Sequence, residues 1–425
     1  MSFQQGLSGL NVASKSLDVI GNNIANSGVA GFKGATAQFG DVFASSIGGG
    51  GAGAGAVGIG AQLQAVAQQF SQGNITSTNN PMDLAINGGG FFRMSDAGNI
   101  SYSRNGQFHV DKDGGIINNT GQALTGYAAD ASGNILATTA APIMVPTGSL
   151  APNDTGAFKS VMNLNAGATV KAPASFDTTN PSTFNNSTSG TVFDSIGGSH
   201  TMTLYFLKTA ANAWNTYVQI DGASAGAPLQ PTGVTPASSA LVFTTGGALS
   251  TAMPLTMSVN LATVAAAQVP PVTNSAATPL VFTLDFTGST QYGNPFSVTT
   301  LTQDGYASGS LSSIGIGGDG IMVGHYSNGQ TKNLGQVVLA NFANPNGLTS
   351  AGSNQWKDNT ESGLPIVGVP GTGTLGALQS SAIEDSNVDL TAELVNMITA
   401  QRIYQANAQS IKTQDSVLQT LVNLR

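Results

Sequence analysis

Residues 386–425, SNVDLTAELVNMITAQRIYQANAQSIKTQDSVLQTLVNLR, form the stretch around which the rest of the chain is interpreted. Apolar residues recur in it at a spacing of seven, with a second line four residues further on. The first line is Leu390, Met397, Tyr404, Ile411 and Leu418, and the second is Leu394, Gln401, Ala408, Asp415 and Val422. This heptad spacing predicts a helix with an apolar seam. Ser386 and Asp389 have the spacing of an N-terminal capping box, and no Pro or Gly follows, so one helix is expected up to the end.

The N-terminus carries a matching pattern. Its seam residues are Phe3, Leu10, Leu17 and Ile24, with Leu7 at the first companion position, and they predict a helix over about 3–24. Two terminal helices with matching seams are expected to pair as a coiled-coil-like hairpin. The alternative is two ordinary amphipathic helices packed on a globular core. Because three of the C-terminal companion positions are Gln, Ala and Asp, an isolated two-stranded coil would be weak, and packing among many helices is favoured.

The composition argues against several classes of partner and site. The chain has 425 residues, of which only 8% are charged, and a net charge of −8. Its 13 basic residues are scattered, so neither nucleic acid nor an anionic membrane is an expected partner. Cysteine is absent, which excludes disulfides and thiolate metal sites. No apolar run reaches the ~20 residues of a membrane span, and the N-terminus has neither the basic nor the apolar region of a cleaved signal peptide.

Four parts are expected along the chain. The predicted fold class is mainly β with helical termini and discontinuous antiparallel β domains, sandwich or barrel, one inserted in the other. Period-two segments separated by Gly, Asn and Asp turns indicate the strands, and a shift towards Ala, Thr, Ser and Pro marks the insertion. The predicted parts are a terminal helical assembly domain (1–30 and 385–425), an extended, Gly-rich connector (31–70 and 364–384), a first β domain (71–146 and 285–363) and an inserted β domain (147–284).

Two glycine motifs resemble catalytic or cofactor signatures. Residues 315–320, GIGGDG, match GxGxxG, but a strand and a turn follow where a dinucleotide site needs a helix, so a Gly-rich hairpin is predicted. Residues 222–226, GASAG, match GxSxG, but two prolines follow where a nucleophile elbow needs a helix, so a loop is predicted.

The remaining polar candidates do not suggest a site either. His109, His200 and His325 lie far apart in the sequence, without the short spacing of a metal site, and are interpreted as surface or strand-face residues. Residues 111–114, DKDG, resemble part of a calcium loop but lack its other ligands, so a turn is predicted. No pair of carboxylates stands out. We therefore expect no enzyme activity, no metal and no cofactor.

Three segments resemble a known family, the axial proteins of the bacterial flagellum. Residues 8–33, SGLNVASKSLDVIGNNIANSGVAGFK, are similar to the signature shared by rod, hook and junction proteins. The family motif positions are Asn22, Asn23, Asn26, Gly31, Phe32 and Lys33; Val29 departs from the Thr that is common there. Residues 82–94 and 102–108 resemble the family's first β domain, and residues 386–425 resemble the C-terminus of hook proteins. Distal rod proteins share both ends but are much shorter and lack such an insertion, so the resemblance is to the hook branch.

The resemblance implies a structural polymer outside the cell. Hook subunits form a curved, flexible tube, a universal joint that passes motor torque from the rod to the filament. The implied partners are other copies of the chain, the distal rod, hook cap and hook–filament junction proteins, and the flagellar type III export apparatus, which needs no cleaved signal. The implied assembly seam is Phe3, Leu7, Leu10, Leu17, Ile24, Leu390, Leu394, Met397, Tyr404, Ile411, Leu418 and Val422.

Other classes remain as alternatives. The chain could be another axial protein such as the distal rod. It could also be a secreted β-rich adhesin or binding module, which would remain a monomer with folded ends. A cell-wall hydrolase on an axial scaffold would need paired carboxylates in a polar cleft, and the few acidic residues offer no obvious pair.

Overall fold

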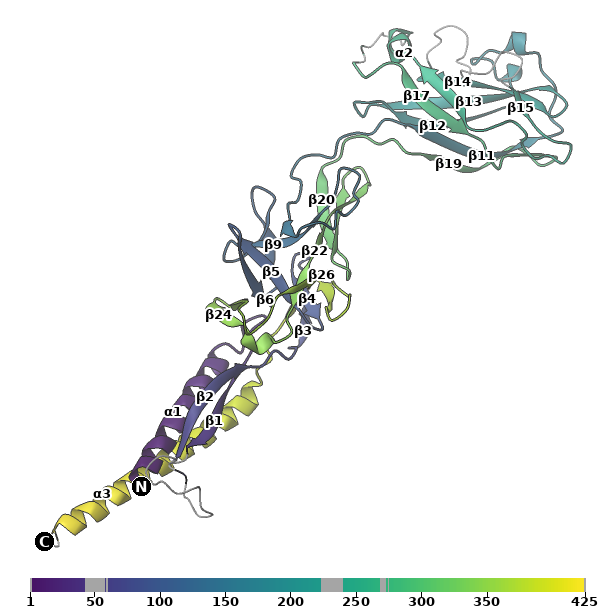
Figure 1. The fold of residues 1–425 in the computed structure, drawn as a ribbon. Helices are drawn as coiled ribbons and strands as arrows, with labels where there is room; N and C mark the ends of the chain where they lie inside the picture. The colour runs from purple at the N-terminus through teal and green to yellow at the C-terminus, as the bar shows by residue number, and fades with distance from the viewer. Residues whose placement is uncertain are drawn as a thin grey trace. The chain divides into compact units, whose positions relative to one another are not determined.

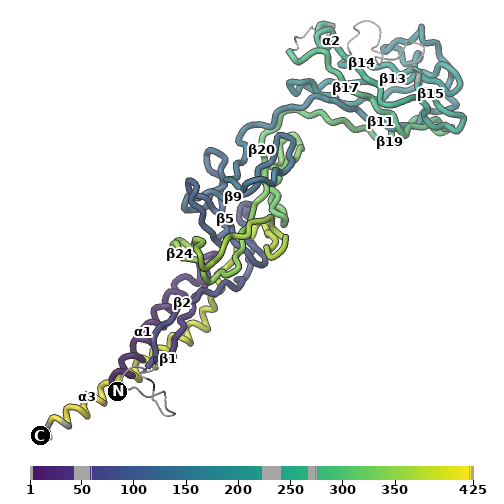
Figure 2. The backbone as a smooth tube through the Cα atoms, in the orientation of Figure 1, coloured from purple at the N-terminus to yellow at the C-terminus, as the bar shows by residue number. Residues whose placement is uncertain are grey.

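The computed structural model describes residues 2–42, 58, 60–222, 240–267, 273 and 275–423. The chain divides into two compact units. Unit 1 comprises Met1–Thr147, Ser312–His325 and Thr331–Arg425, and unit 2 comprises Gly148–Leu311 and Tyr326–Gln330. The chain leaves unit 1 after Thr147 and returns at Ser312, a course that can be followed by colour in Figure 2.

Unit 1 begins and ends with two long helices, α1 (Ser2–Ala25) and α3 (Leu390–Asn423). They run antiparallel along each other (Figure 1), which agrees with the predicted helical hairpin. The predicted start of α3 needs a correction. The helix is capped by Asp389, whose Oδ1 accepts hydrogen bonds from the backbone N–H of Thr391 (2.9 Å) and Ala392 (3.1 Å). Ser386 instead forms a local turn by accepting from Val388 N–H.

A β-hairpin accompanies the helices. Strands β1 (Ala35–Val42) and β2 (Gly60–Gln68) pair antiparallel, and both contact α1. Residues 31–70 were predicted to be part of an extended, Gly-rich connector, and the structure pairs two segments of this stretch, Ala35–Val42 and Gly60–Gln68, as a hairpin. The Gly/Ala-rich run at 47–60, within the predicted connector, lies mostly outside the described residues.

The β part of unit 1 is built on a 13-stranded sheet with the main order β20-β21-β22-β9-β5-β6-β25-β24, and the pairs β27–β4 and β28–β3 lie beside it. Its first strands are β3 (Ile75–Ser77), β4 (Leu84–Asn87), β5 (Phe91–Asp96), β6 (Asn99–Ser103), β7 (Phe108–Val110), β8 (Ile116–Asn118), β9 (Ala123–Ala128) and β10 (Ala141–Pro142). After unit 2 follow β20 (Leu311–Ile316), β21 (Ile321–Tyr326), β22 (Thr331–Val337), β23 (Leu339–Asn341), the 3-10 turn Pro345–Gly347, β24 (Thr349–Gly352), β25 (Gln355–Lys357), β26 (Ile366–Gly368), β27 (Ala377–Ser380) and β28 (Ala382–Glu384). An aromatic cluster of Phe91, Tyr102, Phe342 and Trp356 lies in its core.

Unit 2 contains a five-stranded and a four-stranded sheet that share one apolar core. The first sheet contains β11 (Ala157–Asn165), β16 (Leu255–Val259), β17 (Leu280–Asp285), β18 (Thr290–Tyr292) and β19 (Ser297–Gln303). The second contains β12 (Asn186–Phe193), β13 (Ser199–Ala210), β14 (Ala213–Ile220) and β15 (Ala240–Val242), and the short helix α2 spans Leu261–Ala267. Two 3-10 turns, Pro173–Ser175 and Pro181–Thr183, lie between β11 and β12.

Two features of unit 2 differ from the sequence prediction. Residues 285–311 belong to unit 2 and not to the first β domain, because β18 and β19 both pair with β11. The first sheet also is not wholly antiparallel, since β11 runs parallel to β17 and to β18. Trp214 marks the core shared by the sheets: it is fully buried, and its indole N–H donates to Gln291 Oε1 at 3.0 Å.

Candidate assembly site

A buried charge cluster joins the helical end of unit 1 to its β part. Lys33 Nζ lies 2.6 Å from Glu384 Oε1, and Arg104 lies 3.0 Å from Glu384 Oε2. Lys33 also donates to Ser71 O at 2.7 Å, and Gly73 N–H donates to Glu384 Oε1 at 2.8 Å. Burial lowers the pKa of Lys33 and of Arg104 from their usual values, although Glu384 opposes both shifts. Two cations and one carboxylate are therefore enclosed where both terminal segments meet the β part.

Other motif residues hold the same junction through backbone contacts. Asn23 is buried; its amide donates to Ala35 O (2.8 Å) and to Glu393 Oε1 (2.9 Å), and its Oδ1 accepts from Ala35 N–H. Asn387, just before α3, accepts from Gly34 N–H at 2.8 Å and donates to the carbonyl of Gln69 at 2.7 Å. These amides join segments more than 300 residues apart, so the junction is formed by both ends of the chain.

Three motif residues shape the end of α1. The Asn26 side chain donates to Asn22 O at 2.9 Å, near the helix C-terminus, and the Asn26 backbone N–H donates to the same carbonyl. Phe32 N–H donates to Val29 O in the turn that follows. Gly31 has φ +68°, and a Cβ there would lie 2.4 Å from the backbone carbon of Arg104. Only glycine fits this position.

Small residues form the contact between α1 and α3. Gly6, Ala13 and Ile20 are buried on α1, again at heptad spacing. A Cβ on Gly6 would lie 3.0 Å from Ile411 Cγ1, so Ile411 already packs on α1. On α3, Ala400 is buried. Glycine and alanine at this contact let the helices approach closely, while many of the large residues of both helices remain exposed on other faces.

The structure accordingly divides the predicted seam residues. Seven are exposed on the chain: Phe3 (48%), Leu7 (47%), Leu390 (46%), Leu394 (45%), Tyr404 (38%), Leu418 (56%) and Val422 (74%). Leu10, Leu17, Ile24, Met397 and Ile411 are half-buried. Four further exposed apolar residues of α3 lie off the predicted lines, namely Val395, Ile398, Ile403 and Val417. Helix α3 therefore presents apolar side chains on several faces, and α1 covers only one of them.

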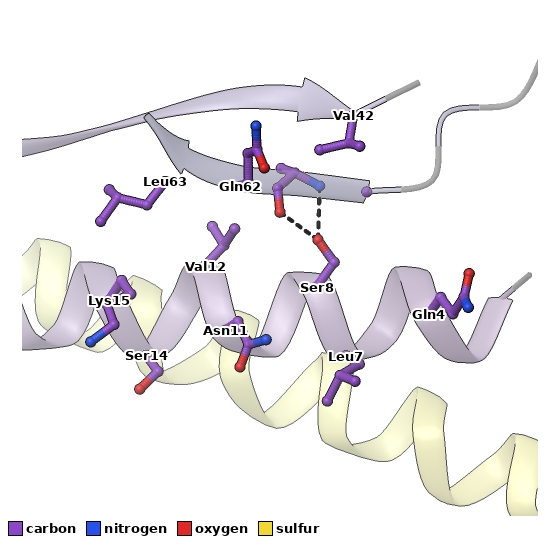
Figure 3. Close-up of a pocket in the computed structure, with 12 residues that line it drawn as sticks. Gln4, Leu7, Ser8, Asn11, Val12, Ser14, Lys15, Val42, Gln62 and Leu63 are labelled. Atoms are coloured by element: carbon purple, nitrogen blue, oxygen red, sulfur yellow. Dashed lines mark hydrogen bonds between the residues drawn. The ribbon is translucent and has the colours of Figure 1, made fainter. Parts of the chain in front are cut away.

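A groove runs between α1 and the β1–β2 hairpin. Figure 3 shows Ser8 pointing from α1 to β2, where its hydroxyl accepts from Ala61 N–H at 2.8 Å and donates to Ala61 O. Beside this contact lies an open, mainly apolar hollow of about 570 Å³. Its lining includes Leu7, Asn11, Lys15 and Leu63, and Leu63 is 38% exposed. The groove adds a concave apolar surface that heptad analysis had not predicted.

The glycine and aspartate motifs have structural roles where they are described. Residues 315–320 include the β20–β21 turn, in which Gly317 N–H donates to Ile321 O, so the hairpin prediction is confirmed. Residues 111–114 form a turn in which Gly114 N–H donates to Asp111 O. In the GxSxG match only Gly222 lies within the described residues. Over the described part of the chain, no group of three or more His, Asp or Glu residues is suited to a metal ion, and no helix is long and apolar enough to span a bilayer.

The three histidines lie in three different strands. His109 lies in β7 and His325 in β21, whereas His200 lies in β13 of unit 2. His200 Nδ1 is 2.6 Å from Asp221 Oδ2, and its Nε2 is 3.2 Å from Asp194 Oδ2. Burial alone would lower the pKa of His200, but the hydrogen bonds and charges of Asp221 and Asp194 outweigh it and raise the pKa above its usual value. The cluster ties the ends of β12, β13 and β14 together.

Comparisons with known proteins cover the whole chain. The matching family models are the Flagella basal body rod protein (residues 3–33), the Flagellar hook protein FlgE/F/G D1 domain (85–166), the Flagellar basal body protein FlaE D2 domain (163–306) and the Flagellar basal body rod FlgEFG protein C-terminal (379–424). The chain is 42% identical to the flagellar hook protein FlgE of Escherichia coli and also to that of Salmonella typhimurium, over 100% of each chain. A crystal structure of Helicobacter pylori flagellar hook protein FlgE2 matches 73% of this chain and 100% of that chain, with 12% identity and a TM-score of 0.49.

Proposed function

The chain belongs to the flagellar hook protein FlgE family and is a structural subunit of the flagellar hook; on this premise we propose that copies polymerise through their terminal helices into a curved, flexible tube that passes torque from the rod to the filament. The observation that carries the proposal is the exposure of large apolar residues along α3, from Leu390 (46%) to Val422 (74%). Large apolar side chains exposed in this number along one helix support a site of association.

The energetics support association through this surface. Burying a large apolar side chain contributes about 1.5–3 kcal/mol. The large apolar residues of α3 are already about half-buried on the chain, so three of them buried against neighbouring copies would supply on the order of 2–5 kcal/mol before the entropic cost of association. With only 8% charged residues in the chain, little charge repulsion opposes close packing between copies.

The buried junction gives the subunit a way to transmit force. Lys33 and Arg104 both contact Glu384, which immediately precedes the segment leading into α3. A load on the helices would reach the β part through these contacts and through the Asn23 and Asn387 amides. We propose that this junction is the stiff element within each subunit and that bending of the tube takes place between subunits.

The proposed partners follow the position of a hook in the flagellar axis. They are other copies of this chain along the tube, the distal rod protein at one end, and the hook cap and hook–filament junction proteins at the other. Export by the flagellar type III apparatus would place the subunit outside the cell without a cleaved signal peptide. A structural role requires no catalysis, cofactor or metal.

Electron microscopy of the purified protein under polymerising conditions tests the proposal. We expect tubes, and we expect Leu394→Asp to prevent them while the isolated chain keeps its circular dichroism spectrum. A wild-type protein that remains a monodisperse monomer with folded ends at high concentration and high salt would favour a secreted binding module instead.

A further inference from the structure

Helix α3 continues beyond the end of its partner helix. Gly6, near the start of α1, already lies against Ile411, yet α3 extends to Asn423 and projects past the N-terminus in Figure 1. Leu418 and Val422 fall on the same helical face as Ile411, seven and eleven positions later. They are 56% and 74% exposed because α1 no longer covers this face. Because α1 begins at Ser2, four residues before Gly6, its first turn reaches about as far as Asp415, and we call residues 416–423 the overhang.

The groove between α1 and the hairpin is long enough to hold the overhang. Its α1 wall runs from Gln4 to Lys15, which is twelve residues or about 18 Å of helix. The overhang has eight residues and is about 12 Å long. The exposed side chains of Leu7 and Leu63 offer the groove an apolar surface for Leu418 and Val422.

Charge also matches. Lys15 is the charged residue among those that line the groove, and its only described ion pair is a solvent-exposed one with Asp18 at 3.2 Å. Asp415, which immediately precedes the overhang, lies on the same face as Ile411 and accepts a hydrogen bond from Gln419. The nearby cation Lys412 points about 100° away from that face around the helix. Exposed pairs of this kind contribute little affinity but help to fix the register of a contact.

We propose that the overhang of one copy lies in the groove of a second copy, displaced along the helix axis by about one overhang length, ~12 Å. The inference rests on the proposed function and names the contact within it. Each copy presents an overhang at one place and a groove at another, so the contact is heterologous and does not close on itself. Repetition of such a contact produces an open filament.

Cysteine crosslinking tests the contact, because the chain has no cysteine of its own. A Leu7→Cys/Leu418→Cys variant, polymerised and then oxidised, should give a ladder of covalent multimers on a non-reducing gel, and the dilute monomer should not. The matched control is Leu7→Cys/Thr413→Cys, because Thr413 lies on the opposite face of α3 from Ile411. It should give no ladder.

Charge exchange provides a second measurement. Lys15→Glu should raise the critical concentration for polymerisation by about two- to fivefold, and Asp415→Lys added to it should restore the wild-type value. Normal tubes without a Leu7–Leu418 crosslink, or with a ladder in the Thr413 control of equal strength, would overturn the groove contact and leave the proposed function standing. Failure of the cysteine-free parent to polymerise would instead overturn the proposed function.

Discussion

Replacing Glu384 with Gln should destabilise unit 1 severely. Its carboxylate is completely buried and is the shared partner of Lys33 and Arg104, whose side chains are 0% and 4% exposed. The substitution keeps the shape of the side chain but leaves two buried cations without an anion. Removing one partner of a buried ion pair typically costs about 3–5 kcal/mol, and here both cations lose theirs. We therefore expect a loss of at least about 4 kcal/mol in the free energy of unfolding of unit 1.

Lys33→Met is the matched comparison. It also removes an ion pair, but it leaves Arg104 and Glu384 as a balanced pair and removes a cation whose burial is unfavourable. The remaining penalty is the Ser71 carbonyl that loses its donor, so the cost should stay below about 2 kcal/mol. The electrostatic reasoning predicts a much larger loss in the free energy of unfolding for Glu384→Gln than for Lys33→Met, and this difference is its test.

Tryptophan fluorescence can follow unit 1 alone. The chain has two tryptophans, Trp356 in unit 1 and Trp214 in unit 2, so urea unfolding in a Trp214→Phe background reports on unit 1. Trp356 is 2% exposed and contacts Phe70 and Phe91, and its fluorescence should change on unfolding. Equal losses for the two variants, or a Glu384→Gln protein as stable as the parent, would refute the account of the junction.

Three further outcomes are expected. Gly31→Ala should lower the free energy of unfolding of unit 1 by about 3 kcal/mol or more, because it combines a left-handed φ with a clash at the Arg104 backbone. Gly28→Ala, with open space around it, should change that free energy by less than about 0.5 kcal/mol. Equal effects of the two variants in urea unfolding would contradict this. Because the folded-state pKa of His200 is raised, its contribution to the stability of unit 2 is fully present below the unfolded-state pKa of about 6.5 and is lost as the pH rises through the folded-state pKa. His200→Gln should flatten this pH dependence of stability. The same dependence of stability on pH in the variant and in the wild type would exclude the mechanism. A variant in which a short Gly/Ser link replaces residues 148–311 should still form tubes, with altered stiffness, in electron microscopy. A deletion protein that folds but never assembles would contradict this.

Local patterns were sufficient to predict the elements but not their partners. The heptads predicted both terminal helices, and glycine and aspartate turns predicted hairpins such as that at residues 315–320. The parallel pairing of β11 with β17 could not be predicted, because it joins strands more than 100 residues apart and no turn sequence encodes it. The predicted boundary of unit 2 was wrong for the same reason, since β19 belongs to this unit through its pairing with β11.

Sequence patterns could not predict the buried charge cluster of the junction either. Lys33 and Glu384 are 351 residues apart, and Arg104 and Glu384 are 280 apart. None of the three stands in a charge pattern that a local window detects. The resemblance to the flagellar family singled out Lys33 but gave it no physical role, and burial against Glu384 supplies one.

The seam shows most clearly what hydrophobic periodicity measures. The heptad of large residues predicted contact but could not say with what, and Ile411 packs on the chain's own α1 while Leu418, seven residues later, is exposed. The contact between α1 and α3 instead uses Gly6 and Gly9, which lie against Ile411 and Asn407 and are too small to register as an apolar seam. These glycines let the two helices approach closely, while many of the large residues remain exposed on other faces. In a chain that folded only for itself, such an arrangement would expose the most strongly apolar side chains to water without compensation. It is consistent with a subunit whose lowest free energy is reached among its neighbours.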